Sequence, residues 1–258
     1  MTTITMTTKK NVIWITGASM GIGRALALEL ASRGHTVIAS ARSEDKLTTL
    51  VEESASLPGS IHAYPLDVTH QQAVNDAVAA IQKDFSTIDQ AILNAGTFLP
   101  MQGNRFKADV IKQQFDLNVF GVSYCLEALI PVMKQQKQGL LAINASLAGY
   151  RGLPKSAAYG ATKAALINMA ECLKLDLDRE GIDVKVINPG FVKTPLTDKN
   201  DFHMPFLVDS EQAARVISDG LARSRFEIRF PTLFAGLLGL LKHLPYRCYF
   251  ALVKRAKI

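Results

Sequence analysis

Two side chains suited to proton transfer, Tyr159 and Lys163, lie four positions apart in the sequence. In a helix this spacing places a phenol and an ammonium on the same side, within reach of each other. A phenol with an ordinary pKa of about 10 is a poor proton carrier at neutral pH, but a neighbouring cation favours the phenolate and lowers that pKa. The pair therefore indicates a general acid or base, although it also fits a surface lysine beside a half-buried tyrosine.

The residues around this pair must form the helix that the chemistry needs. Between residues 156 and 178, apolar side chains recur at helical spacing, namely at Leu166, Met169, Ala170, Leu173 and Leu177. Such a pattern is typical of a helix with a wide apolar face. We therefore expect a helix over residues 156–178 with the phenol and the ammonium near its start.

A glycine-rich turn follows the first apolar run of the chain. Residues 11–16 are rich in β-branched side chains, Gly17, Gly21 and Gly23 come next, and a helical apolar pattern begins after them. Glycines allow the backbone to approach a pyrophosphate, and the N-terminus of the following helix directs N–H groups toward it. Strand, glycine turn and helix together predict a nucleotide-binding site, with a plain tight turn as the alternative.

The next predicted strand, residues 35–40, ends beside a base rather than an acid. A site for NAD places Asp or Glu at this point to hold the ribose 2′-hydroxyl, whereas this chain has Arg42. A guanidinium matches the oxygens of a 2′-phosphate, and Ser40 could add a further contact. The pattern favours NADP(H) over NAD(H), unless Arg42 only pairs with Glu44 or Asp45 in solvent.

Strands alternate with helices along the rest of the chain. We predict strands over residues 60–66, 89–93, 140–144, 183–187 and 226–230, and helices over residues 70–84, 118–136 and 209–220. This alternation predicts an α/β fold with a Rossmann-type doubly wound parallel sheet in a single domain. Five residues that could take part in the chemistry follow the ends of different predicted strands, where open sheets of this kind bind ligands: Gly17, Asp67, Asn94, Ser146 and Pro189.

Several motifs occur in a fixed order along the chain. They are Thr16 with the glycine turn, Asp67-Val68, Asn94-Ala95-Gly96, Asn118, Ser146, Tyr159-x-x-x-Lys163, and Pro189-Gly190 followed by Thr194. Over roughly residues 11–230 the chain resembles the short-chain dehydrogenase/reductase family in its single-domain form. The resemblance implies that Tyr159 exchanges a proton with the substrate oxygen and that Ser146 hydrogen-bonds this oxygen. It also implies that Lys163 holds the nicotinamide ribose and lowers the pKa of Tyr159, while Asn118 supports a water that links Lys163 to solvent.

The same resemblance implies a cofactor site. Asp67 and Val68 would flank the adenine, Asn94 to Gly96 would line the cofactor at a strand end, and residues 187–194 would touch the nicotinamide. The full expected set is Gly17, Ser19, Met20, Gly21, Ile22, Gly23, Ser40, Arg42, Asp67, Val68, Asn94, Ala95, Gly96, Tyr159, Lys163, Pro189, Gly190, Val192 and Thr194. The family's usual Asn-Asn-Ala-Gly motif has Leu93 in place of the first Asn, from which we expect a modest change of cofactor contact.

Apolar side chains predominate in the segments expected to border the substrate, residues 98–106, 147–153 and 191–208. We expect Phe98, Leu147, Leu153 and Phe191 in this pocket. The substrate would be an apolar, lipid-like ketone or secondary alcohol. Residues 191–208 would form a lid that orders on binding.

The composition of the 258 residues narrows the class of protein. The three cysteines are scattered, without the paired spacing of a zinc site or a disulfide framework, so we expect no metal and a cytoplasmic setting. The net charge of +6 is concentrated in residues 223–258, which hold eight Lys and Arg residues against Glu227 alone. We expect no nucleic-acid partner. Residues 1–10 are Thr-rich without the apolar run of a signal peptide, and we expect a flexible tail there.

The family resemblance, which supports a domain over residues 1–230, does not explain residues 231–258. The uncharged run over residues 230–241 is shorter than the roughly 20 residues that cross a bilayer as a helix. A second helix after Pro245 would place aromatic and apolar side chains on one face and two cations on the other: Tyr246, Tyr249, Phe250 and Val253, against Arg247 and Lys254. This mixture is typical of a helix in a membrane interface, so peripheral contact with the inner face of a membrane is one expectation. A cover for the pocket or an oligomer contact is the alternative.

These observations favour an NADPH-dependent oxidoreductase that transfers a hydride between the nicotinamide and a carbonyl or secondary alcohol, with Tyr159 as general acid or base. The competing hypothesis is a catalytically silent nucleotide-sensing or membrane-docked interaction protein on the same fold. An epimerase or dehydratase is less well supported, because no added sugar-binding domain is found. The family further implies a homodimer or homotetramer joined through the helices that contain Asn118 and Tyr159.

Overall fold

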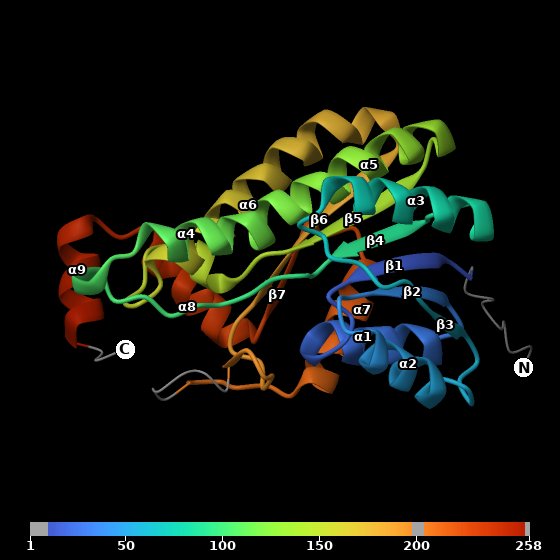
Figure 1. The fold of residues 1–258 in the computed structure, drawn as a ribbon. Helices are drawn as coiled ribbons and strands as arrows, with labels where there is room; N and C mark the ends of the chain where they lie inside the picture. The colour runs from blue at the N-terminus through green and yellow to red at the C-terminus, as the bar shows by residue number, and fades with distance from the viewer. Residues whose placement is uncertain (1–9, 198–203, 256–258) are drawn as a thin grey trace, which may run out of the picture.

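The computed structural model describes residues 10–197 and 204–255. Within these ranges seven parallel strands form one sheet in the order β3-β2-β1-β4-β5-β6-β7 (Figure 1). The strands are β1 (Val12–Thr16), β2 (Thr36–Ser40), β3 (Ser60–Ala63), β4 (Gln90–Leu93), β5 (Gly139–Asn144), β6 (Ile182–Pro189) and β7 (Glu227–Phe230). The strand order reverses between β1 and β4, which is where doubly wound sheets bind ligands. The predicted Rossmann-type fold is confirmed.

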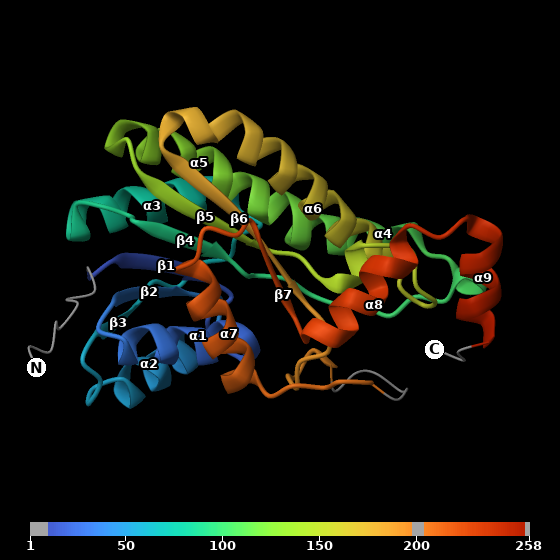
Figure 2. The ribbon, with the colours of Figure 1, turned by 180° about the vertical axis from the view of Figure 1, so that it is seen from behind.

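Helices cover both faces of this sheet (Figures 1 and 2). The helices are α1 (Gly21–Ser32), α2 (Glu44–Glu53), α3 (Gln71–Phe85), α4 (Ala108–Phe115), α5 (Gly121–Gln136), α6 (Ala157–Leu177), α7 (Ser210–Leu221), α8 (Thr232–Lys242) and α9 (Tyr246–Arg255). On one face α1, α2 and α7 bury side chains such as Leu26 and Ile217 against the sheet. On the other face α3, α5 and α6 bury side chains such as Leu129 and Leu166. The apolar stripe predicted on α6 is thus part of the core.

One difference from the predicted elements is at β3. This strand ends at Ala63 rather than at residue 66. Pro65 has no backbone N–H to donate and interrupts the ladder, although the N–H groups of Tyr64 and Leu66 still donate to the carbonyl oxygens of Ala39 and Ala41 at 2.9 Å.

Another difference is the helix expected over residues 118–136, which begins earlier. α4, a single π-helical turn (Asp116–Phe120) and α5 form one continuous helical segment. In α4 only Gln114 is buried, although Ala108, Ile111 and Phe115 recur there at helical spacing. The whole segment, Ala108–Gln136, is long and apolar enough to cross a bilayer by length and composition alone. Because Val122, Leu126 and Leu129 are buried in the core, we interpret it as a core helix.

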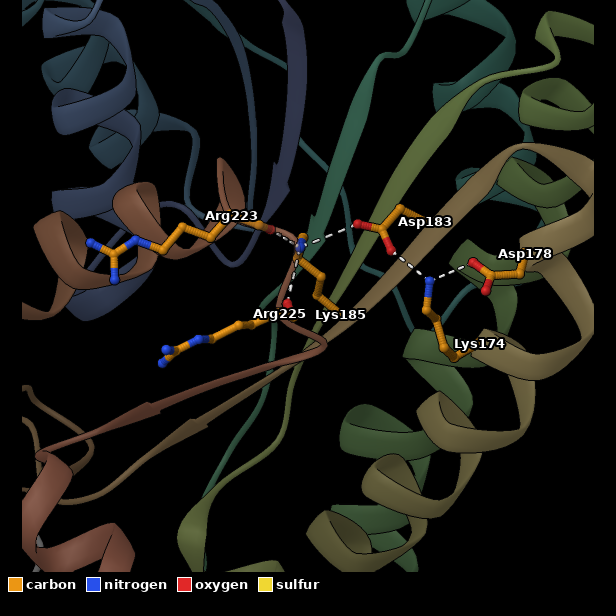
Figure 3. Close-up of polar contacts among 6 residues, drawn as sticks. All are labelled: Lys174, Asp178, Asp183, Lys185, Arg223 and Arg225. Carbon is orange, nitrogen blue, oxygen red and sulfur yellow. Dashed lines mark hydrogen bonds and ion pairs between the residues drawn. The ribbon is translucent and has the colours of Figure 1, made fainter.

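A buried lysine on β6 links this strand to its neighbours. The side chain of Lys185 is 1% exposed, and its ammonium donates to the carbonyl oxygens of Arg223 and, at 3.0 Å, of Arg225 (Figure 3). It also lies 3.2 Å from the carboxylate of Asp183, which accepts a hydrogen bond from Lys174 on α6 at 3.0 Å. These contacts join β6 to α6 and to the turn that precedes β7.

The two C-terminal helices lie at the end of the molecule that also carries α4 (Figures 1 and 2). The buried side of α8, formed by Phe234, Ala235 and Leu238, packs against Leu147. The helices predicted after residues 231 and 245 are therefore present, and α8 contacts the segment that follows β5. The division into a domain of residues 1–230 and an extension of residues 231–258 stays a prediction. Most of the expected tail, residues 1–9, lies outside the described residues.

Two side chains attach α9 to the rest of the fold. Tyr249 is the one buried residue among the ten of α9, and its hydroxyl donates to the carbonyl oxygen of Gly152 at 2.6 Å. The guanidinium of Arg151 lies 4.1 Å from the centre of the Tyr249 ring and donates to the carbonyl oxygens of Leu241 and Leu244 at 2.8 and 2.7 Å. The ends of α8 and α9 thus meet on residues 151 and 152.

Candidate active site

A cleft of about 1060 Å³ lies at the carboxyl ends of β1, β2, β4, β5 and β6. It is lined by most of the residues that the sequence predicts for a cofactor and for proton transfer: Gly17, Ser19, Met20, Gly21, Ile22, Arg42, Asp67, Val68, Asn94, Ala95, Gly96, Ser146, Tyr159, Lys163, Pro189, Gly190, Val192 and Thr194. Leu99, in a segment expected to border the substrate, also lines it, and other lining residues were not expected, among them Lys46, Thr97, Gln113, Leu117 and Asn144. Three expected residues, Gly23, Ser40 and Asn118, lie behind the cleft wall.

The turn between β1 and α1 requires its glycines. Gly17 and Gly21 have φ values of +69° and +55°, a region that favours glycine. A Cβ on Gly17 would lie 2.8 Å from the Cα of Ala95. A Cβ on Gly23 would lie 2.3 Å from the carbonyl oxygen of Gly17, so Gly23 allows α1 to close against the turn rather than lining the cleft. The result is a backbone cradle at the N-terminus of a helix, which suits a phosphate group.

Asn94 holds the floor of this cradle. Its Nδ2 donates to the carbonyl oxygens of Thr16 and Gly17 at 3.1 and 3.2 Å, and its Oδ1 accepts from Nδ2 of Asn144 at 2.7 Å. The hydroxyl oxygen of Thr16 accepts from the N–H groups of Asn94 and Ala95 at 3.0 and 3.1 Å. Sequence analysis did not assign these supporting contacts to Thr16 or Asn144. Both residues end a strand, Thr16 just before the glycine turn and Asn144 just before Ser146. These positions could have indicated their supporting role.

Ser146, Tyr159 and Lys163 meet in the cleft near the end of β5. The Tyr159 hydroxyl is hydrogen-bonded to the side chain of Ser146, whose oxygen also accepts from the N–H of Ala148 at 3.1 Å. Lys163 is 4% exposed, and its Nζ donates to the carbonyl oxygen of Asn144 at 2.7 Å. That Nζ lies 5.6 Å from the centre of the Tyr159 ring.

The pKa of Tyr159 was expected to be lowered by Lys163, but in the structure it is raised. Burial raises the pKa of Tyr159 to about 12, and the hydrogen bond with Ser146 only partly opposes this. Burial also lowers the pKa of Lys163 to about 7, because an ammonium stripped of water loses its solvation. The neighbouring cation is therefore weakened by the same burial that acts on the phenol, and the phenol stays protonated at neutral pH.

Asn118 lies in the π-helical turn behind Gly96. Its side chain accepts from the N–H of Thr97 at 2.7 Å and donates to the Thr97 carbonyl and to the Thr162 hydroxyl, both at 3.0 Å. The Thr162 hydroxyl in turn donates to the Tyr159 carbonyl oxygen at 2.7 Å. Asn118 therefore joins the loop after β4 to the helical turn that carries Tyr159. The predicted link through water from Lys163 to solvent stays a prediction.

Arg42 is exposed where the chain leaves β2. Within residues 10–197 and 204–255 it forms no ion pair with Glu44 or Asp45, which was the alternative considered from the sequence. Lys46, on the first turn of α2, lines the cleft beside it. Ser40 does not join them, because it is buried and its hydroxyl oxygen accepts from Nε1 of Trp14 at 2.9 Å.

A family model described as short chain dehydrogenase matches residues 11–204. This chain belongs to the short-chain dehydrogenase/reductase family. An oxidoreductase of Myxococcus xanthus described as uncharacterized is 36% identical to it over 243 residues, 94% of this chain and 96% of the relative. The 3-oxoacyl-(acyl-carrier-protein) reductase FabG of Thermotoga maritima is 34% identical over 188 residues, 73% of this chain and 76% of that enzyme. The solved structure of ElxO with NADP bound has a TM-score of 0.79 at 25% identity and covers 88% of this chain and 100% of that one.

The four residues expected around the substrate do not line the cleft in this short-chain dehydrogenase/reductase. The Phe98 ring meets the Tyr159 ring edge-on, with centroids 5.3 Å apart. Leu147 and Phe191 pack with α8 instead, and Leu153 is half-buried outside the cleft. Phe98, Leu147 and Phe191 pack against side chains of other elements. Such contacts between distant parts of the chain cannot be predicted from local sequence.

An aromatic stack joins the loop after β6 to α8. The Phe234 ring is stacked with the rings of both Phe191 and Phe206, with centroids 5.7 Å away in each pair. The two ends of this loop are also hydrogen-bonded to each other, because the N–H of Lys193 donates to the Val208 carbonyl oxygen at 2.8 Å. Residues 198–203 of the expected lid lie outside the described residues, so ordering on ligand binding stays a prediction.

The burial of Lys163 in this family member predicts a pH-dependent stability. Its ordinary pKa is 10.5 and its folded-state pKa is about 7, so between these values the unfolded chain binds more protons and stability rises with pH. Below about pH 7 the cost of burying the charged amine is fully present. A Lys163→Met variant lacks this contribution. We expect the difference in unfolding free energy, wild type minus variant, to grow by up to about 1.4 kcal/mol per pH unit.

Urea unfolding of both proteins between about pH 7 and about pH 9 measures this difference, because other titrating groups are common to both. Parallel stability profiles for the two proteins would show that Lys163 keeps an ordinary pKa in the folded state.

Proposed function

We propose that this chain is an NADPH-dependent reductase of apolar, lipid-like carbonyl compounds, also able to run toward the secondary alcohol. The family supports oxidoreduction with a nicotinamide cofactor. The observation that carries the finer proposal is a protonated phenol, Tyr159, hydrogen-bonded to Ser146 in a cleft that begins at a glycine cradle. The proposal competes with a catalytically silent nucleotide-binding protein on the same fold.

The residues of the cleft fit a dinucleotide. Gly17 and Gly21 let the turn lie close to Ala95 and Thr194, where a Cβ would come within 2.8 and 2.9 Å of their atoms, and the first N–H groups of α1 face the cleft. Gly96 lies over Asn118 and Lys163, with its own Cβ position 3.7 Å from the Lys163 Nζ. Residues 94–96, 163 and 189–194 would hold the nicotinamide half, and Asp67 and Val68 the adenine. When bound, the nicotinamide supplies the hydride for the substrate carbon.

The proton chemistry belongs to the chain's own residues. A phenol with a pKa of about 12 carries its proton at neutral pH, so Tyr159 is ready to donate it to a carbonyl oxygen. Ser146 would hold that oxygen through a hydrogen bond from its hydroxyl. Because alcohol oxidation would first require the phenolate, this protonation state favours the direction of carbonyl reduction.

Preference for NADPH is supported by the charge at the adenosine end of the cleft. Arg42 and Lys46 both line it, and they can meet a 2′-phosphate with a planar fork and a point charge. Asp67 lies close enough to Arg42 for the positive charge of Arg42 to affect the pKa of Asp67. Burial raises the pKa of Asp67, but hydrogen bonds from Thr69 and the charges of Arg42 and His70 outweigh this, and the pKa is lowered.

An apolar substrate is supported by Leu99, Leu117 and Leu196, which line the cleft, and by the Phe98 ring against Tyr159. We expect kcat/KM for methyl ketones to rise with chain length from butanone toward dodecanone, by up to roughly fourfold for each methylene buried. NADPH oxidation measured across this series, with sugars and small polyols as controls, tests the proposal. Preference for the polar compounds would reject the substrate class, and NADPH binding without any turnover would favour the catalytically silent protein.

We further propose a homodimer or homotetramer in the cytoplasm. Phe120 in the π-helical turn and Leu175 on α6 are 49% and 80% exposed. Apolar side chains on this helical layer would be covered if copies of the chain packed through α5 and α6.

A further inference from the structure

α8 presents an uncovered apolar stripe. Leu233, Leu237 and Leu240 are 71%, 50% and 67% exposed, and their spacing places them on one side of the helix. The opposite side of α8 is the one that packs on Leu147. The helix is therefore apolar all round, although only one side has a partner within the described residues.

α9 also exposes aromatic side chains. Tyr246 and Phe250 are 72% and 53% exposed, and their rings are stacked with centroids 5.9 Å apart. Leu252 is 47% exposed. A helix of ten residues with one buried side chain gains little stability of its own in water, so burial of its exposed apolar side would stabilise it.

Both helices carry positive charge, most of it on α9, whereas the Lys242 Nζ of α8 lies 5.6 Å from the centre of the Tyr150 ring. No Asp or Glu occurs after Glu227, whereas Lys242, Arg247, Lys254 and Arg255 all belong to α8 or α9. In the described part of the chain none of these four cations forms an ion pair with an acidic side chain. A partner that covers this surface must therefore combine apolar groups with negative charge.

We infer that α8 and α9 dock on the surface of an anionic lipid bilayer. Each helix is too short to span a bilayer, but leucines, tyrosines and cations of this kind suit the interface, with the apolar groups among the acyl chains and the cations at lipid phosphates. A second copy of the chain is a poorer occupant, because two such surfaces facing each other would oppose cations without any acidic partner.

Docking at this surface would place the lipid one helix away from the cleft. Phe234 on the buried side of α8 packs on Leu147, which directly follows Ser146. Apolar compounds dissolved in the bilayer would then lie close to the cleft, a consequence that rests on the proposed function. The docking itself needs no turnover.

Flotation of the full-length protein with liposomes tests the inference. We expect the wild type to float with vesicles that contain phosphatidylglycerol, to float poorly with phosphatidylcholine alone, and to be released by salt. Arg247→Gln combined with Lys254→Gln should weaken binding by roughly 25-fold, since each cation near an anionic surface contributes about fivefold. Leu237→Ser combined with Leu240→Ser should weaken it by at least about tenfold.

The matched control combines Arg215→Gln and Val216→Ser, which change an exposed cation and an exposed apolar residue on α7. It should float like the wild type. Equal flotation of all variants, or binding that ignores lipid charge, would overturn the inference. Self-association without lipid that the two leucine substitutions abolish would assign the surface to a second copy instead. NADPH binding and turnover of a soluble ketone, measured on each variant, report folding and the proposed function separately from docking.

Discussion

Replacing Tyr159 with Phe is expected to lower kcat for ketone reduction by about 10²–10⁴-fold, the usual contribution of a positioned general acid. The variant loses only the hydroxyl that is hydrogen-bonded to Ser146. The ring keeps its edge contact with Phe98, and Lys163 keeps its hydrogen bond to the Asn144 carbonyl. The cleft should therefore retain its shape, and the Kd for NADPH should change by no more than a few-fold. Steady-state kinetics and a fluorescence titration of NADPH measure the two quantities.

Tyr124→Phe is the matched control for this experiment. Tyr124 is half-buried on α5 and does not line the cleft, so loss of its hydroxyl should leave kcat nearly unchanged. Turnover by Tyr159→Phe at the rate of the wild type would refute the assigned mechanism. Loss of both turnover and NADPH binding would instead show that the substitution had disturbed the cleft.

Replacing Arg42 with Ala is expected to weaken NADPH binding by roughly 10- to 100-fold. Hydrogen bonds to charged groups contribute about 1.5–3 kcal/mol each, and a guanidinium that meets a phosphate with two parallel bonds lies at the upper end of this range. NADH has no 2′-phosphate, so its affinity should change little. The wild type should accordingly bind NADPH more tightly than NADH, and the variant should have lost most of that difference. Titration of both nucleotides against both proteins measures the change in preference.

Arg179→Ala provides the control, because Arg179 is exposed after α6 and does not line the cleft. It changes the net charge equally but should not alter either affinity. Equal binding of NADPH and NADH by the wild type would contradict the assigned preference. A similar loss for both nucleotides in Arg42→Ala would show that Arg42 serves the cleft in general rather than the 2′-phosphate.

The parts of the fold that local pattern specifies were predictable. Short apolar runs predicted the strands. The residues at their carboxyl ends lie at one edge of the sheet because parallel strands end together. The helix of Tyr159 followed from the spacing of its apolar side chains. α4 was not among the predicted helices, and its burial does not follow from apolar spacing, because its one buried side chain is Gln114. The amide of Gln114 is hydrogen-bonded to the N–H and the carbonyl oxygen of Leu99 at 3.2 and 3.1 Å.

Other features of the site depend on the surroundings of a residue rather than on its type. Spacing indicated that Lys163 lies near Tyr159, but burial, which raises the pKa of Tyr159 to about 12, acts only once the sheet and α6 are packed. A lysine on a strand, such as Lys185, would be expected to face solvent. Lys185 is buried instead, because its ammonium donates to two carbonyl oxygens and pairs with the carboxylate of Asp183. Ser40 was expected in the cleft, yet the indole of Trp14 holds its hydroxyl below the surface.

The stack of Phe191, Phe234 and Phe206 has a consequence for exchanging segments between relatives. The family model ends at residue 204, so two of the three rings, Phe206 and Phe234, lie beyond it. A chimera that took its C-terminal helices from a relative would replace Phe234, and the rings of Phe191 and Phe206 would then contact a side chain of the other parent. The loop after β6 and α8 should therefore be transplanted as one unit, with all three aromatic positions inherited from the same parent.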